Sequence, residues 1–203
     1  MIHIINYGLG NLSSIKNIIT KVGGISTIVN DVSQIKDASK IILPGVGAFD
    51  HGMRKLGEEG WISGLESAAL ERNIPILGIC LGMQLMCNRS EEGKLSGLGW
   101  IDAEVCRFNM TPDAKLKVPH MGWNTVAIQK ENLLLNKTQE EQRFYFVHSY
   151  HVVCNVQSDE LATANYGYNF TAAFNKGNIF GVQFHPEKSH RFGMELLRKF
   201  IAL

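Results

Sequence analysis

Residues 74–89 constrain the fold most, because they place a cysteine between two glycines at the junction of a strand and a helix. The apolar run Ile74–Ile79 is typical of a buried strand, and Met83–Asn88 predicts the opening of a helix. Between them lies Gly78-Ile79-Cys80-Leu81-Gly82, a G-x-C-x-G form of the nucleophile elbow. On such a turn the backbone is strained, and a Cβ two residues to either side of Cys80 would collide with the neighbouring strand or helix.

Two interpretations of Cys80 follow from this position. The partial positive charge of a helix N-terminus favours thiolate over thiol, which suits a catalytic nucleophile. A buried cysteine after a core strand is the plainer alternative. The pentapeptide alone does not separate them, so the rest of the chain has to decide.

Composition and charge exclude several classes of protein. The chain has 203 residues, 45% of them hydrophobic, and a formal net charge of +1, which suits a single domain over residues 1–203. Charges of both signs are mixed, so no basic face indicates nucleic acid. We expect no signal peptide and no membrane segment, since no apolar run approaches the roughly 18 residues of a span. The four cysteines form no C-x-x-C pair, so we expect a cytoplasmic protein with free thiols.

Strands alternate with helical segments in the first half of the chain. Strands are predicted at residues 2–6, 26–29, 40–43 and 74–79, and helices at residues 12–22 and 58–71. This order predicts an α/β fold with a mostly parallel open sheet flanked by helices. In the carboxyl half, an added antiparallel region is predicted from segments 100–108, 121–129, 144–154, 161–165, 171–175 and 179–184, before a final helix at 190–203. Ligands of such sheets lie beyond the carboxyl ends of the strands, where Cys80 would emerge.

A glycine-rich segment, Pro44-Gly45-Val46-Gly47-Ala48-Phe49, follows the third strand at that same edge. Glycines on both sides of Val46 let the backbone approach a ligand and present N–H groups to it. An acyl-transfer site needs such donors: the N–H of Leu81 and one from a neighbouring loop would bind the developing oxyanion. An ordinary strand–helix turn also explains the segment, and no nucleotide-binding glycine motif is present.

The segment Phe180–Glu187 supplies the partners that a nucleophile requires. An apolar strand leads to His185, Pro186 fixes the local backbone, and a period of two would place Glu187 on the same side as His185. His185 can exchange a proton near neutral pH, and Glu187 can hold its tautomer and stabilise the imidazolium. A strand-end histidine in a surface turn is the alternative. Together with Cys80, the set of nucleophile, base and orienting group favours a catalytic triad.

Two further polar segments end or join the predicted strands. Val118–Asn124 is predicted to place an aromatic and two polar side chains in one turn. His148 and His151 end a strand and resemble metal ligands. No carboxylate or cysteine stands at ligand spacing from them, so we expect neither a metal nor a cofactor.

At this point the two motifs Gly78–Gln84 and His185-Pro186-Glu187 together resemble those of the class I glutamine amidotransferases. Within that family, Tyr7–Asn11, Pro44–Phe49 and Pro119–Asn124 are similar to segments of the glutaminase subunits of imidazole glycerol phosphate synthase, an enzyme of histidine biosynthesis. The resemblance runs nearly end to end and implies hydrolysis of glutamine to glutamate and ammonia.

The resemblance also implies roles for individual residues. Cys80 attacks the side-chain carboxamide, His185 protonates the leaving ammonia and then activates water, and Glu187 orients His185. The oxyanion hole is expected, after a rearrangement of the glycine loop, from the backbone of Leu81, Val46 and Gly47. Glutamine contacts are implied for Gly45, Gly47, Gln84, His148, Ser149 and Tyr150.

A partner subunit is expected from the resemblance and on physical grounds. The resemblance implies a heterodimer with a (β/α)8-barrel synthase that receives the ammonia, with interface positions at Asn11, Met121, Trp123 and Lys188. A chain of 203 residues leaves no room for an acceptor site, and ammonia released into neutral water is mostly protonated and no longer nucleophilic. Trp123 could equally be a core residue or an exposed interface anchor.

Three alternatives stay open. Asn6 stands where most such subunits have Asp, so the chain could instead be a paralogue that supplies ammonia for amidation of surface-polysaccharide sugars. A stand-alone thiol hydrolase acting on γ-glutamyl or ester substrates would share the elbow and the triad. A catalytically silent regulatory subunit would retain the fold for binding alone.

Overall fold

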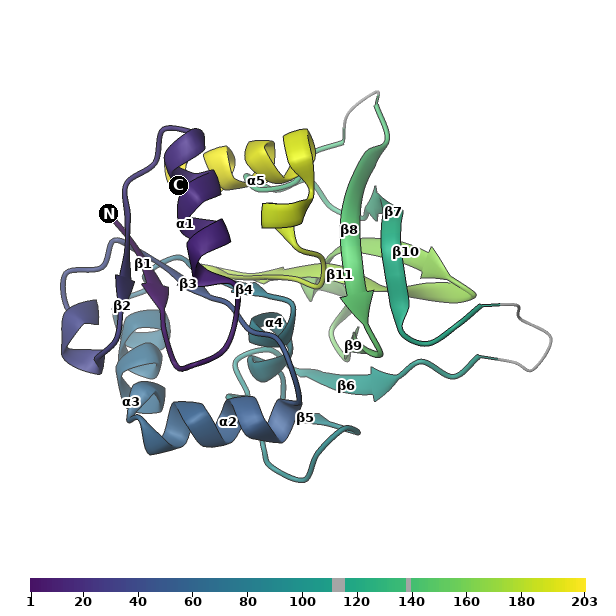
Figure 1. Ribbon diagram of the computed structural model, residues 1–203. Helices are drawn as coiled ribbons and strands as arrows, with labels where there is room; N and C mark the ends of the chain where they lie inside the picture. The colour runs from purple at the N-terminus through teal and green to yellow at the C-terminus, as the bar shows by residue number, and fades with distance from the viewer. Residues whose placement is uncertain (111–115, 138–139) are drawn as a thin grey trace.

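A mixed sheet of 12 strands runs through the computed structural model, which describes residues 1–110, 116–137 and 140–203 (Figure 1). The main path of the sheet has the order β2-β1-β3-β4-β12-β11-β10-β7-β8, and β5, β6 and β9 pair beside it. The strands are β1 (Ile2–Ile5), β2 (Ser26–Val29), β3 (Lys40–Leu43), β4 (Ile76–Ile79), β5 (Arg89–Ser90), β6 (Ala103–Arg107), β7 (His120–Ile128), β8 (Gln142–His148), β9 (Tyr150–Cys154), β10 (Glu160–Tyr166), β11 (Tyr168–Lys176) and β12 (Ile179–Val182).

The helices are short, and most of them lie in the first half of the chain. The α-helices are α1 (Leu12–Lys21), α2 (Phe49–Glu58), α3 (Trp61–Glu66), α4 (Leu81–Leu85) and α5 (His190–Ala202). Single turns of other helix types are η1 (Val32–Ile35), η2 (Ser67–Glu71), η3 (Gln157–Asp159) and η4 (Pro186–Lys188). None of the helices in the described part of the chain is long and apolar enough to cross a membrane.

The parallel and antiparallel halves of the sheet meet at β12. Strands β2, β1, β3, β4 and β12 pair in parallel, whereas β12, β11, β10, β7 and β8 pair antiparallel. The predicted α/β fold with an antiparallel carboxyl region is therefore confirmed. Because β4 and β12 are parallel neighbours, with Ile79 beside Val182, the segments that follow them emerge side by side.

Helices cover both faces of the parallel half, as Figure 1 shows with α1 and α5 on one face and α2 and α3 on the other. Successive strand residues point to opposite faces. Ile4 accordingly packs in the same cluster as Ile15 and Leu196, whereas Ile5 packs with Leu56 and Trp61. The parallel strands are thus buried on both faces, which explains their continuous apolar runs.

One helix was not expected, and two local expectations were wrong. Phe49–Glu58 is a helix that was not predicted, although Phe49, Met53 and Leu56 are buried along one side of it. The predicted strand 144–154 is two strands interrupted at Ser149, because β8 pairs with β7 and β9 pairs with β6. The segment expected to form a turn at Val118–Asn124 instead enters β7 at His120.

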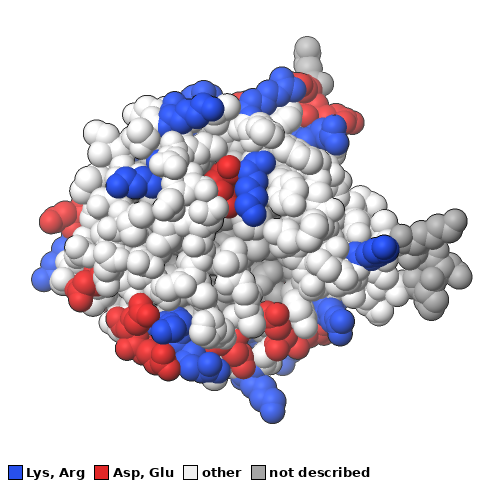
Figure 2. Space-filling view, viewed as in Figure 1, with Lys and Arg blue, Asp and Glu red and all other residues white. Residues whose placement is uncertain are grey.

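Charged side chains of both signs are interspersed on the face seen in Figure 2, with uncharged surface between them. This view agrees with the small net charge of +1. It gives no sign on that face of the single-sign field that nucleic acid would require.

Candidate active site

Cys80 lies on a strained turn between β4 and α4. Its φ of 54° and ψ of −110° are unusual for a residue with a side chain. A Cβ on Gly82 would lie 1.8 Å from the Leu43 carbonyl oxygen, and one on Gly78 would lie 2.7 Å from the Met83 nitrogen. Both glycines are therefore required by close backbone packing, and the predicted elbow is confirmed. The helix after it is shorter than expected and begins at Leu81.

His185 and Glu187 form a buried pair beyond the end of β12. His185 Nδ1 lies 2.8 Å from Glu187 Oε1, and their side chains are 3% and 2% exposed. Glu187 reaches the imidazole through the 3-10 turn η4, which begins at Pro186, and not through the extended backbone assumed from the sequence. The backbone N–H of His185 also donates to the Tyr145 carbonyl at 2.9 Å, which connects the turn to β8.

The surroundings of His185 favour its protonated form. Burial opposes a charge there, but the adjacent Cys80 sulfur and the hydrogen-bonded Glu187 carboxylate outweigh it and raise the pKa of His185 to about 9. Nε2 of His185 is buried and forms no hydrogen bond of good geometry within the described residues, so it is available to a substrate beside the thiol. A positive imidazolium at this place would stabilise a thiolate on Cys80.

The expected oxyanion donor is occupied by the neighbouring loop. The Leu81 N–H donates to the Gly45 carbonyl at 3.3 Å. Gly47 has a φ of 104°, a conformation that favours glycine. The loop is anchored at its start, since the buried Tyr7 hydroxyl donates to the Pro44 carbonyl at 2.7 Å. Leu81 is thus beside the loop, as predicted, but the hole is not assembled in this conformation.

One cavity of about 410 Å³ joins most of the predicted residues. Its lining includes Val46, Gly47, Cys80, Leu81, Gln84, His148, Ser149, Tyr150 and His185. Gln84 is held from two sides, because its Nε2 donates to the Tyr150 carbonyl at 3.1 Å and to Gln183 Oε1 at 2.9 Å. Gln183 in turn directs its own Nε2 toward Cys80 Sγ at 3.7 Å.

Three residues near this cavity were missed by the sequence analysis. Glu92 lines the rim and accepts a hydrogen bond from the Phe49 N–H at 2.9 Å. Tyr7 and Gln183 lie behind the loop and the thiol. Tyr7 was noted only as part of a motif. Glu92 follows another glutamate in what looks like a solvated turn, so no sequence signal distinguished it.

The residues expected at a partner interface lie outside the cavity. Met121 and Trp123, on the same side of β7, are 62% and 41% exposed, so Trp123 is not a core residue. The Trp123 ring stacks on His190 at 5.4 Å, and the Lys188 ammonium lies 5.7 Å from the centre of the Tyr145 ring. Asn11 caps α1 by accepting from the Ser14 N–H. These placements leave the interface role a prediction.

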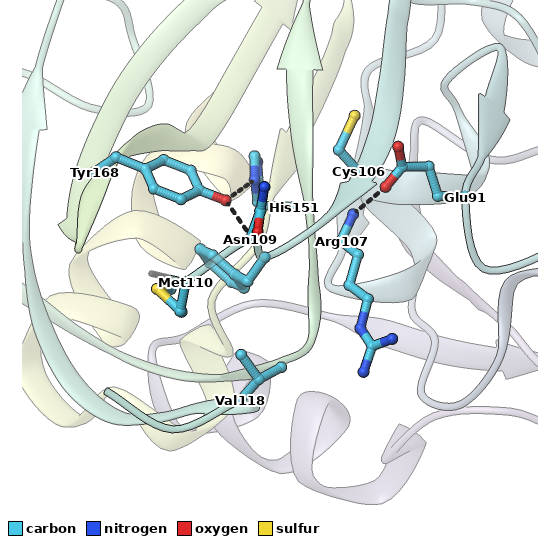
Figure 3. Close-up of a pocket in the computed structure, with 9 residues that line it drawn as sticks. Glu91, Cys106, Arg107, Asn109, Met110, Val118, His151 and Tyr168 are labelled. Atoms are coloured by element: carbon cyan, nitrogen blue, oxygen red, sulfur yellow. Dashed lines mark hydrogen bonds between the residues drawn. The ribbon is translucent and has the colours of Figure 1, made fainter. Parts of the chain in front are cut away.

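A larger cavity of about 760 Å³ borders β6 and β9, and its lining includes none of Cys80, His185 and Glu187 (Figure 3). In it the Tyr168 hydroxyl lies 3.0 Å from His151 Nε2 and accepts from the Asn109 N–H. Nε2 of His151 is thus hydrogen-bonded to the Tyr168 hydroxyl. Within the described residues, no three His, Cys, Asp or Glu side chains gather as a metal would require.

The arrangement of a strained cysteine, a buried His–Glu pair and a glycine loop agrees with a comparison to known families. Residues 3–203 match the family model described as "Glutamine amidotransferase class-I". The chain belongs to this family. The predicted resemblance is therefore confirmed over almost the whole sequence.

Within this amidotransferase family, the chain is most usefully compared with two curated relatives. It is 52% identical over 201 residues to imidazole glycerol phosphate synthase subunit HisH 2 of Methanococcus maripaludis, covering 99% of this chain and 98% of the relative. It is 47% identical over 203 residues to the subunit of the same name from Pseudomonas aeruginosa, with full coverage of both chains. The amidotransferase is thus similar to HisH subunits from end to end.

Solved structures confirm the fold of this amidotransferase independently of close sequence similarity. The structure of PurLQS from Thermotoga maritima matches with a TM-score of 0.76 at 18% identity, covering 99% of this chain and 97% of that one. At this identity the match concerns the fold alone.

Proposed function

We propose that this chain is the glutaminase subunit of imidazole glycerol phosphate synthase, which hydrolyses glutamine and passes the ammonia to a synthase subunit in histidine biosynthesis. The observation that carries the proposal is the triad cavity, where Cys80 and His185 face the same space as Gln84 and the segment His148–Tyr150. Full-length identity to HisH subunits supports the choice of pathway.

The triad supports hydrolysis through a thioester. The Cys80 thiolate attacks the carboxamide carbon of glutamine, and protonated His185 gives its proton to the leaving ammonia. His185, now neutral, takes a proton from water, which attacks the thioester and releases glutamate. Glu187 bonds to Nδ1 and so keeps Nε2 directed at the reacting atoms throughout.

Acceptors around the cavity fit the ammonium group of an amino acid. Both hydrogens on Gln84 Nε2 are used by Tyr150 and Gln183, and no donor of the described residues occupies its Oε1. The Glu92 carboxylate at the rim adds a negative charge, held in place by the Phe49 N–H. We infer that Gln84 Oε1 and Glu92 bind the α-ammonium of glutamine, while backbone N–H groups of Ser149 and Tyr150 bind its carboxylate.

The occupied oxyanion donor supports dependence on a partner. While the Gly45 carbonyl accepts from Leu81, the Leu81 N–H cannot stabilise a substrate oxyanion. The proposed active state turns the loop so that the N–H of Val46 or Gly47 joins that of Leu81. Docking of a (β/α)8-barrel synthase against Met121, Trp123, Lys188 and the Asn11 region is the proposed cause of the turn, with ammonia moving to the synthase without entering bulk water.

Asn6 was the reason to consider the alternative acceptor reaction, the amidation of polysaccharide sugars. In the structure Asn6 donates to Asn30 at 2.6 Å and accepts from the Gly8 N–H at 3.2 Å. Neither contact involves the triad cavity, so Asn6 gives no support to a different acceptor. The histidine pathway is therefore retained.

Glutamate release, measured with and without the synthase subunit of the same organism, tests the proposal. We expect little release by the chain alone, strong release from the complex, and formation of imidazole glycerol phosphate from the synthase substrate. Cys80→Ala should abolish release, whereas Cys106→Ala, which removes a thiol on β6 outside the triad cavity, should not.

Three results would contradict the proposal in different ways. Activity that survives in Cys80→Ala would exclude the triad. Full activity without a partner would indicate a stand-alone thiol hydrolase. Failure of a reactive glutamine analogue to label Cys80 in the complex would indicate a silent subunit.

A further inference from the structure

Two buried histidines form a pair beside the triad cavity, and neither takes part in the chemical steps of hydrolysis. His120 on β7 and His148 at the end of β8 are 3% and 6% exposed. They are 28 residues apart in sequence and become neighbours because the β7–β8 register pairs them directly. The His120 ring is stacked between Phe146, at 4.9 Å, and Tyr166, at 4.1 Å. This packing fixes the plane of the His120 ring.

Hydrogen bonds join the pair into a chain that runs from Asn124 to the Tyr150 carbonyl. Asn124 Nδ2 lies 3.3 Å from His120 Nε2, and His120 Nδ1 lies 3.0 Å from His148 Nε2. His148 Nδ1 lies 2.8 Å from the Tyr150 carbonyl oxygen. Four groups are thus connected by three contacts of hydrogen-bond length.

The direction of every bond in this chain is fixed by its two ends. A carbonyl oxygen only accepts, so His148 Nδ1 carries a proton, and the Nε2 of a neutral His148 must accept from His120 Nδ1–H. His120 Nε2 then accepts from the Asn124 amide. At the other end, the Asn124 oxygen accepts from the Thr125 N–H and its nitrogen also donates to the Asn165 carbonyl, which requires the same orientation. Both ends give one consistent set of tautomers.

Both rings are neutral in this arrangement. Burial lowers the pKa of His120 to about 4. Burial lowers the pKa of His148 to about 3 despite its bond to Tyr150, with the nearby His120, His151 and His185 adding to the effect. The chain of bonds therefore stays intact throughout the neutral range.

The chain ends on a group that shapes the triad cavity. The Tyr150 carbonyl accepts from both His148 Nδ1 and Gln84 Nε2, and residues His148, Ser149 and Tyr150 line the cavity. Ser149 lies between β8 and β9, and the backbone bond that holds it joins its carbonyl to the Phe108 N–H at 3.1 Å. The carbonyl at Tyr150 is instead fixed from two sides by side chains.

We propose that His120 is a positioning residue for glutamine binding, which through His148 fixes the Tyr150 carbonyl and with it the Ser149–Tyr150 segment. This inference rests on the proposed function, because it requires that the segment binds the amino-acid end of glutamine. His120 itself does not line the cavity. Its loss should weaken substrate binding more than the chemical step.

Substitutions at His120 test the proposal in the complex with the synthase subunit. His120→Phe keeps an aromatic ring in the stack but removes the donor, and we expect KM for glutamine to rise about tenfold with kcat within about twofold. His120→Asn places an amide nitrogen where Nδ1 lies, and we expect it to restore most of the KM. Tyr166→Phe is the matched control, since it loses a hydroxyl bonded to the Lys117 carbonyl in the same stack but leaves the chain of bonds intact.

A second variant keeps the proposal testable if His120→Phe does not fold. Asn124→Asp preserves shape and the bond from the Thr125 N–H but presents an acceptor to His120 Nε2. It should draw the proton to that atom, remove the donor to His148, and also raise KM. Nitrogen NMR shifts of the two imidazoles would report the change of tautomer.

The outcomes separate this inference from the proposed function. Absence of glutamate release by the wild-type complex would overturn the function. With an active wild type, three results would overturn the role of His120 alone: an unchanged KM in folded His120→Phe or Asn124→Asp, equal KM values for His120→Phe and His120→Asn, or a fall confined to kcat.

Discussion

The Leu81 N–H, a donor of the proposed oxyanion hole, donates its hydrogen bond to the Gly45 carbonyl, 3.3 Å away. Loss of one oxyanion-hole donor typically costs about 10²–10³ in kcat. We therefore expect glutamate release to rise at least about 10²-fold when the synthase subunit is bound and its acceptor site is filled. Steady-state rates for the free chain, the empty complex and the filled complex would measure this. Equal rates in the last two would show that acceptor occupancy does not turn the loop.

Gly82 gives a prediction about stability that does not depend on function. Gly82→Ala would place a Cβ 1.8 Å from the Leu43 carbonyl oxygen, where only backbone movement of β3 or α4 can relieve the clash. We expect a loss of unfolding free energy of about 3 kcal/mol or more, or failure to fold.

A matched glycine provides the control for Gly82. Gly57 lies in α2, and a Cβ there would meet its nearest neighbour, an Ile62 methyl, at 3.8 Å. Gly57→Ala should stabilise the protein by about 0.5–1 kcal/mol because alanine is the better helix former. Urea unfolding of both variants would measure the difference, and a neutral Gly82→Ala would contradict the packing argument for the elbow.

The elbow could be predicted because local chemistry determines it. A strained cysteine needs glycines on both sides at fixed spacing, and the sequence displays all three residues within five positions. Helix α2 was missed although Phe49, Met53 and Leu56 have helical spacing, since Gly52 and Gly57 lower the helix propensity of the segment.

Long-range pairing could not be predicted in the same way. Apolar strand residues stand on both sides of the polar segment 148–151, so only the choice of partner strand, β7 for one part and β6 for the next, reveals the break. The contact of His120 with His148 depends on that same register. Glu92 reaches the cavity because its turn folds back on the start of α2, which no local pattern encodes.

His185 gives a prediction about pH. Its folded-state pKa, about 9, is above the ordinary 6.5, so the free energy of folding that it contributes is fully present below pH 6.5 and is lost as the pH rises through 9. Glu187→Gln removes one of the charges that raise this pKa. We expect the stability advantage of wild type over Glu187→Gln to shrink between pH 6.5 and 9, as followed by denaturant unfolding at each pH.

The same substitution should reduce catalysis, because a carboxamide does not stabilise the imidazolium. A fall in kcat of about 10³–10⁴-fold is expected, by analogy with loss of the orienting carboxylate in other triads. A stability difference that is constant over this pH range would show that Glu187 does not set the charge of His185.

Tyr7 anchors the start of the glycine loop and yields the last prediction. Its buried hydroxyl donates to the Pro44 carbonyl at 2.7 Å, and burial raises the pKa of Tyr7, with the nearby Cys80 adding to the effect, so that it remains a donor. Tyr7→Phe would leave that carbonyl without its donor and lower the unfolding free energy by about 1–3 kcal/mol. Tyr166→Phe removes a hydroxyl–carbonyl bond of the same length, 2.7 Å, to Lys117 and not to the loop.

The two tyrosine variants should differ in how they affect the loop. Without the Tyr7 bond, Pro44 can shift, and the Gly45 carbonyl can break and re-form its bond to the Leu81 N–H in the absence of the synthase subunit. In Tyr7→Phe we therefore expect the ratio of partner-stimulated to basal glutamate release to fall about tenfold. In Tyr166→Phe the ratio should match that of the wild type. If both variants keep the wild-type ratio, the Tyr7 hydroxyl stabilises the fold but does not position the oxyanion loop.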